Sequence, residues 1–186
     1  TELDPLQPEN PYSVSKVTQD VLGYQYFRTH DLPVVRVRPF NHVGPGQSPR
    51  FVLSSFAKQI AEIEMHKSES VLRVGNLSAA RDFTDVRDVV RAYVLLLQKG
   101  VPGEVYNIAS GQARSIQSLV DALIALSTHT INIEIDPDRF RPTDAPVVYG
   151  SAVKLLEHTG WKPEIPFDQT VKDVLYDWRQ QVRAEN

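Results

Sequence analysis

Tyr12 and Lys16 are the first residues of this sequence whose types and spacing could perform chemistry, because they lie four residues apart directly after Pro11. Residues four apart on a helix share one face, so both side chains can reach the same small volume. A free tyrosine has a pKa of about 10, and a neighbouring ammonium lowers such a value. A pair of this kind can exchange a proton with a carbonyl or a hydroxyl. The same spacing also arises by chance, as a half-buried tyrosine beside a solvated lysine.

A second candidate site lies at Asn41 and His42, which follow the β-branched run of residues 34–37 and the strand-ending Pro39. Sheets of parallel strands place their ligands just beyond the carboxyl ends of the strands. The position therefore favours contact with a ligand. The alternative is a loop asparagine in an Asx turn beside an exposed histidine.

Helix signals alternate with strand signals along the chain. Asn10 and Pro11 are a typical N-cap and first-turn pair and predict a helix over residues 11–29. Thr84 or Asp85 is expected to cap a helix that ends at residue 99, and Ser115 to cap another. Further helices are predicted over residues 51–66, 151–159 and 167–182, and strands over residues 34–37, 71–75, 104–110, 131–136 and 147–150. This alternation predicts an α/β fold, and residues 41–50 are expected to form a Gly- and Pro-rich loop.

Composition excludes several classes of function. The 186 residues carry a net charge of −3, which does not favour a nucleic-acid surface, and no apolar run is long enough to span a membrane. The absence of cysteine excludes disulfides and thiol chemistry and favours a cytoplasmic location. The five histidines are scattered, and Asp85 and Asp88 stand where carboxylates cap a helix, so we expect no metal site.

Six motifs occur in a telling order: "NPYSVSK", "VVRVRPFNHVGPGQ", "RDFTDVRDVVRAY", "YNIASG", "RPTD" and "GWKP". Together they resemble the extended short-chain dehydrogenase/reductase family, over essentially the whole chain. The resemblance is strongest to the branch acting on GDP-mannose-derived sugars, which contains GDP-mannose 4,6-dehydratase and the reductase that forms GDP-rhamnose. Gly46 and Gln47 stand near the places where the dehydratase loop carries adjacent arginines, which favours the reductase.

The resemblance implies catalytic and cofactor roles for four residues. Tyr12 would donate a proton to the sugar C4 oxygen, and Lys16 would bind the nicotinamide ribose of NADP or NAD and assist Tyr12. His42 would contact the dinucleotide, and Asn41 would lie between cofactor and sugar. The sequence contains no G-x-G-x-x-G loop for the dinucleotide pyrophosphate. We therefore expect the chain to cover only the C-terminal part of such an enzyme and to be inactive in isolation.

The resemblance also implies a substrate site for a GDP-sugar. Arg81 and Arg141 match family positions that grip the diphosphate, and guanidinium groups suit phosphate oxygens. Asp144 matches a position that accepts the nucleotide ribose hydroxyls, and Asn41 and Arg50 are further candidates. For each arginine alone, a surface salt bridge is the alternative explanation.

The implied architecture is the C-terminal part of a Rossmann-type sheet plus a small α+β substrate-binding domain. Residues 1–50 and 83–112 would belong to the Rossmann part, and residues 51–82 and 113–186 to the substrate domain. The implied reaction is reduction of a 4-keto group in GDP-4-keto-6-deoxy-D-mannose. A dehydratase, an epimerase and a catalytically inactive GDP-sugar-binding module remain alternatives. Exposed sheet edges and the family's habit of pairing through the tyrosine helix predict a homo-oligomer.

Overall fold

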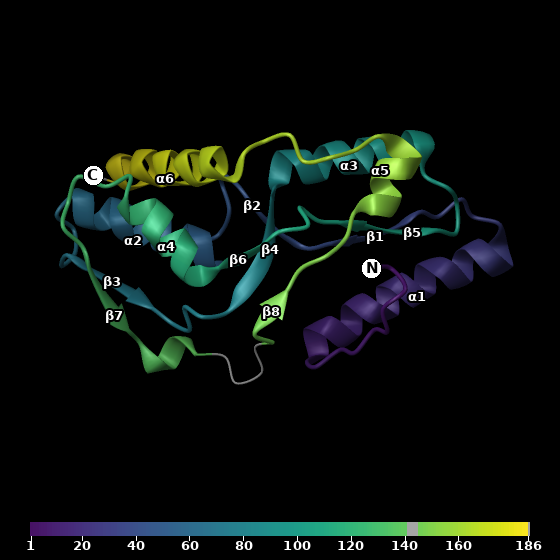
Figure 1. Cartoon of the computed structure of the whole chain (residues 1–186), viewed down its shortest axis with the longest axis horizontal. Helices are drawn as coiled ribbons and strands as arrows, with labels where there is room; N and C mark the ends of the chain where they lie inside the picture. The colour runs from purple at the N-terminus through teal and green to yellow at the C-terminus, as the bar shows by residue number, and fades with distance from the viewer. Residues whose placement is uncertain (141–144, 186) are drawn as a thin grey trace.

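The computed structural model describes residues 1–140 and 145–185 as a mixed α/β fold. Figure 1 shows the elements in space. In chain order they are α1 (Pro11–His30), β1 (Arg36–Pro39), β2 (Asn41–Val43), α2 (Val52–Glu64), β3 (Val71–Val74), β4 (Ala80–Asp85), α3 (Val86–Lys99), β5 (Val105–Ile108), β6 (Ala113–Ser115), α4 (Ile116–Ile124), β7 (Asn132–Ile135), η1 (Pro137–Arg139), β8 (Val147–Val148), α5 (Val153–Thr159) and α6 (Phe167–Ala184).

The helix starts follow from local side-chain chemistry, as predicted. The Asn10 side chain accepts a hydrogen bond of 2.8 Å from the Ser13 N–H at the start of α1. Asp85 caps α3 by accepting from the Arg87 N–H, and Ser115 caps α4 by accepting from the Ser118 N–H. Each cap satisfies an amide that has no partner inside its own helix.

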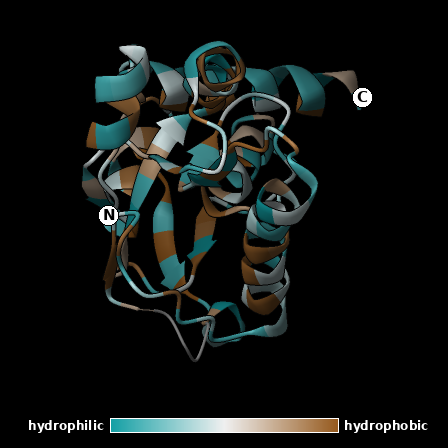
Figure 2. Ribbon diagram, turned by 90° about the vertical axis from the view of Figure 1, so that its right-hand side faces the viewer, coloured by the Kyte–Doolittle hydropathy of each residue, from teal (hydrophilic) through white to brown (hydrophobic). Residues whose placement is uncertain are grey.

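Within the described residues the strands form three small sheets. β1 pairs in parallel with β5, and β3 pairs in parallel with β7. In the third sheet β4 is central: it runs parallel to β2 and β8 and antiparallel to β6. The prediction of a loop over residues 41–50 was wrong for Asn41–Val43, which is β2, and β4 and β6 were not predicted. In Figure 2 hydrophobic and hydrophilic residues alternate along the strands near the centre of the view.

Two clusters of buried hydrophobic residues hold these elements together. The first joins α2, α4 and α6 to β3 and β4, with Phe56, Leu119, Val174 and Trp178 among its members. It lies on the left of Figure 1, where α6 runs beside α2.

The second cluster joins α3 and α5 to β5 and lies on the right of Figure 1. Trp161 is fully buried in it and donates a hydrogen bond of 3.0 Å from Nε1 to the Asp88 carbonyl. The strand β4, which contributes Phe83 to the first cluster, leads directly into α3, which belongs to the second (Figure 1). The predicted domain ranges stay a prediction. Within the described residues, no helix combines the length and apolar character needed to cross a membrane.

Candidate active site

A pocket of about 600 Å³ lies where α1 begins, next to the ends of β1 and β3 and beside β2, α2 and β4. Four of the predicted site residues line it: Tyr12, Asn41, His42 and Arg81. These residues come from three separate elements, so the fold brings together groups that are up to 69 positions apart in the sequence (81 − 12). The other described lining residues are Pro39, Phe40, Val43, Gln47, Phe51, Val52, Ser55, Phe56, Gly75, Asn76, Ala79, Phe83, Ile116 and Arg139.

Of the four remaining predicted residues, the structure describes two, Lys16 and Arg50. Lys16 and Arg50 are not among the described residues that line the pocket. Arg141 and Asp144 fall outside the described residues. The substrate residues expected from the "RPTD" motif therefore stay a prediction.

Tyr12 and Lys16 share one exposed face of α1. Tyr12 is 71% exposed, and the Lys16 ammonium lies 5.5 Å from the centre of its ring. Lys16 Nζ also donates a hydrogen bond of 3.3 Å to Gln19 Oε1. The prediction that Tyr12 and Lys16 share one face of the helix is confirmed. Tyr12 lines the pocket, and the Lys16 ammonium lies one helical turn further along α1.

His42 is held by the backbone around it. Its Nδ1 lies 3.1 Å from the Phe40 carbonyl, which can accept a hydrogen bond from the ring when that nitrogen carries the proton. The Gln47 side-chain amide donates to the His42 carbonyl at 2.9 Å. The pairing of β2 with β4 sets Asn41 opposite Phe83 and His42 opposite Thr84.

The loop after β2 is anchored to helix α6. The Asp177 carboxylate accepts a hydrogen bond of 2.8 Å from the Gly46 N–H. The Ser54 hydroxyl donates to the Gln47 carbonyl at 2.6 Å and accepts from Trp178 Nε1 at 2.8 Å. Helix α6 is thereby linked by hydrogen bonds to the loop that carries Gln47, which lines the pocket.

Alternation along β4 sends neighbouring side chains in opposite directions. Arg81 and Phe83 face the pocket, and Arg81 donates to the Ala80 carbonyl at 2.8 Å. Asp82 between them is fully buried on the other side. Its carboxylate accepts hydrogen bonds from the Ser110 N–H and hydroxyl at 2.8 and 2.6 Å, and from the Gly111 and Gly150 N–H groups at 2.9 and 3.3 Å. Asp82 therefore ties β4 to two loops, a role that the sequence analysis missed.

The pocket has a one-sided charge. Of the described residues that line it, two are arginines, Arg81 and Arg139, and none is an aspartate or glutamate. The whole chain is net negative at −3, so the positive pocket is a local feature. An anionic ligand is favoured there because guanidinium groups donate to oxyanions in pairs. Arg139 was not predicted, since only its position beside the pocket distinguishes it from other arginines.

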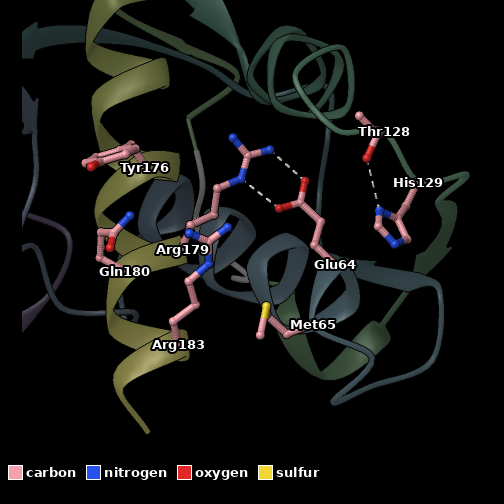
Figure 3. Close-up of a pocket in the computed structure, with 8 residues that line it drawn as sticks. All are labelled: Glu64, Met65, Thr128, His129, Tyr176, Arg179, Gln180 and Arg183. Atoms are coloured by element: carbon pink, nitrogen blue, oxygen red, sulfur yellow. Dashed lines mark hydrogen bonds and ion pairs between the residues drawn. The ribbon is translucent and has the colours of Figure 1, made fainter. Parts of the chain in front are cut away.

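A second pocket, of about 390 Å³, lies between α6, the end of α2 and Thr128 and His129. Figure 3 shows Arg179 forming two hydrogen bonds with Glu64, both 2.7 Å long. Burial raises the pKa of Glu64, but hydrogen bonds from Arg179 and Ser127 outweigh that effect, and the pKa is lowered. None of the predicted site residues lines this pocket, and the Arg179–Glu64 pair joins α6 to α2.

Comparisons with known proteins agree with this geometry. Residues 1–174 match the family model described as GDP-mannose 4,6 dehydratase. A GDP-6-deoxy-D-mannose reductase of Pseudomonas aeruginosa is 42% identical over 178 residues, which cover 96% of this chain and 59% of the relative. A human dTDP-D-glucose 4,6-dehydratase is 30% identical over 185 residues, covering 96% of this chain and 51% of the relative.

Solved structures show the same likeness. RMD from Pseudomonas aeruginosa, complexed with NADPH, superposes with a TM-score of 0.91 at 40% identity, covering 97% of this chain and 59% of that one. A dTDP-glucose 4,6-dehydratase of Bacillus anthracis, in complex with NAD, gives a TM-score of 0.80 at 26% identity, covering 98% and 56%. The predicted Rossmann-like α/β class is thereby confirmed.

The chain spans 59% and 51% of the length of these two curated relatives. Within that span the family model covers nearly every residue, and the motifs of the tyrosine helix and of β4 lie at one pocket. The chain belongs to the GDP-mannose 4,6-dehydratase family.

Proposed function

We propose that this chain forms the nucleotide-sugar-binding part of a nicotinamide-dependent reductase acting on the 4-keto group of GDP-4-keto-6-deoxy-D-mannose. The observation that carries the proposal is a pocket lined by a tyrosine and two arginines, with no carboxylate among its described lining residues. The 42% identity to the Pseudomonas reductase supports the choice of reaction and of sugar.

Tyr12 is the proposed proton donor. When bound, a nicotinamide cofactor, NADPH or NADH, supplies the hydride that reduces the sugar C4. The Tyr12 hydroxyl donates its proton to the C4 oxygen, so the ketone becomes an alcohol and a phenolate remains. The Lys16 ammonium, 5.5 Å from the centre of the tyrosine ring, stabilises that phenolate, and its hydrogen bond to Gln19 leaves further donors for a ribose hydroxyl.

The residues present fit only one end of the cofactor. Tyr12 and Lys16 offer a hydroxyl and an ammonium on an exposed helix face, which suits the nicotinamide ribose. His42 would stand next to it on β2. The 186 residues contain no glycine-rich pyrophosphate loop, so the isolated chain is expected to bind neither NADPH nor NADH and to show no turnover.

Arg81 is the proposed contact to the substrate diphosphate. Its side chain lines the same pocket as Asn41, and the strands that carry the two residues, β4 and β2, are paired neighbours. Arg141 and Asp144 remain proposed contacts to phosphate and ribose. Arg50, away from the pocket lining, is the weakest of the proposed substrate residues.

A dehydratase is the second candidate reaction, because the family model that matches residues 1–174 is described by that activity. An epimerase would use the same tyrosine and lysine. The dehydratase and the epimerase would use the same GDP-sugar pocket as the reductase and would differ from it in the other catalytic groups. A purely binding role without catalysis is the remaining candidate from a different class.

A homo-oligomer through α1 is also proposed. None of the residues of α1 is buried, although Val21, Leu22, Tyr24 and Tyr26 on it are large and hydrophobic. Light scattering of the purified chain tests this proposal, and a monomeric mass at micromolar concentration would contradict it.

Calorimetric titration of GDP, UDP and NADPH into the 186-residue chain tests the binding function. We expect GDP to bind more tightly than UDP, with no heat from NADPH. Arg81→Gln should weaken GDP binding by about tenfold, the cost of one charge-assisted hydrogen bond to phosphate. Equal affinity for GDP and UDP would remove the guanine preference, and silence with both would refute the proposed binding site.

A further inference from the structure

The positively charged side chain of Arg139 lines the pocket near the ends of β3 and β7, and the pairing of these two strands sets its position. The two strands run in parallel, with Val74 opposite Ile135, so their carboxyl ends lie at the same end of the sheet (Figure 1). Just beyond those ends, Asn76 and Arg139 both line the pocket. The two residues are far apart in the sequence, and the parallel pairing of β3 with β7 brings them to the same place.

The close approach of the two exits requires a glycine. A Cβ added at Gly75 would lie 2.6 Å from the Arg139 carbonyl oxygen, nearer than such atoms approach. The absence of a side chain at residue 75 therefore lets the Arg139 backbone cross directly beside the end of β3.

The Arg139 guanidinium is oriented but has donors to spare. Its Nε donates to Asp136 Oδ2 at 3.1 Å, and a terminal nitrogen lies 3.5 Å from Ser55 Oγ on α2. Asp136 in turn is held by its own N–H, which donates to the Val74 carbonyl at 2.8 Å. A guanidinium has five N–H donors, so most of them remain for a ligand. The side chain is 41% exposed, so an incoming anion can reach it.

We propose that Arg139 is a further phosphate-binding residue of this pocket, acting together with Arg81 on the diphosphate of a nucleotide-sugar. The inference rests on the proposed function and adds the residue that grips the phosphates from the β7 side. The contact between the guanidinium and Ser55 Oγ is weak, and a phosphate oxygen replaces Ser55 as the acceptor when the ligand binds. Asp136 keeps the fork oriented, which reduces the side-chain freedom lost on binding.

The test compares three ligands that differ in phosphate: GDP, GMP and guanosine, each titrated by calorimetry into the 186-residue chain and its variants. Arg139→Gln should weaken GDP binding by about tenfold or more and leave guanosine unchanged, because only charge-assisted bonds to phosphate are lost. Arg139→Lys keeps the charge without the planar fork and should give an intermediate affinity.

Arg73→Gln is the matched control. Arg73 lies on β3, is half exposed and is not among the described residues that line the pocket, so its loss changes the same charge elsewhere. If Arg139→Gln weakens GDP no more than Arg73→Gln does, or weakens guanosine equally, the inference is wrong while the proposed function stands. If the unmodified chain binds none of the three ligands, the proposed function itself fails.

Discussion

Asp82 is the residue whose replacement tests the fold most sharply. Its side chain is fully buried beneath the pocket and accepts four hydrogen bonds, from Ser110, Gly111 and Gly150. The aspartate thus joins β4 to the loop after β5 and to the segment before α5. Replacing it by alanine leaves three backbone N–H groups and one hydroxyl without their acceptor, the Gly150 N–H buried and the others partly buried.

The expected loss of stability follows from those contacts. A buried donor left without a partner costs about 1–3 kcal/mol, and such costs are not additive within one cluster. We therefore expect Asp82→Ala to lower the free energy of unfolding by about 3–5 kcal/mol. Asp82→Asn keeps one acceptor oxygen but turns an NH₂ group toward backbone donors, so about 2–3 kcal/mol is expected. Both losses are large against a domain stability of about 5–15 kcal/mol.

Urea unfolding followed by far-ultraviolet circular dichroism measures these differences through the transition midpoint. Asp121→Asn is the control, because Asp121 is exposed on α4, where its carboxylate accepts a hydrogen bond from Gln117, and its replacement should change stability by less than about 0.5 kcal/mol. Equal midpoints for Asp82→Asn and Asp121→Asn would refute the role assigned to the buried carboxylate.

Two further predictions concern titration and packing. Burial raises the pKa of Asp85, but hydrogen bonds from Arg87 and Thr170 outweigh it and hold the pKa below the ordinary 3.8. A lowered pKa stabilises the fold above the unfolded-state pKa, and this contribution is lost as the pH falls through the folded-state pKa. The stability gap between the unmodified chain and Asp85→Asn should therefore narrow below about pH 4 in thermal unfolding at a series of pH values, and a constant gap from pH 7 to 3 would contradict this. Gly103→Ala should lower stability by about 2–4 kcal/mol, since Gly103 has φ of +84° and a Cβ there would lie 2.2 Å from the Phe27 ring; an unchanged melting temperature would show that α1 is not packed as described.

Local sequence chemistry accounts for the helices. The caps at Asn10, Asp85 and Ser115 were predicted from neighbouring residues and are confirmed. A cap satisfies amides within three positions of itself, so the sequence holds all the information needed. The strands at residues 71–74 and 105–108 were found for a similar reason, since each carries a β-branched or apolar run.

The strands β2, β4 and β6 were missed because nothing local distinguishes them. Asn41–Val43 and Ala113–Ser115 have three residues each, and β4 carries Arg81 and two aspartates. Such segments become strands when a neighbouring strand completes their hydrogen bonds. The central position of β4 in the third sheet therefore becomes evident only in the folded chain.

The sequence by itself determined the family and the tyrosine–lysine pair, because motifs and helical spacing are properties of short segments. Only the tertiary structure decided that Arg139 lines the same pocket as Arg81 and that Lys16 is not among its described lining residues. It also decided that Asp82, next to Arg81 on β4, is fully buried. Those placements depend on the parallel pairing of β3 with β7 and on the alternation along β4. Contacts between residues far apart in the chain arise from burial and strand pairing summed over the whole fold, and no single segment encodes them.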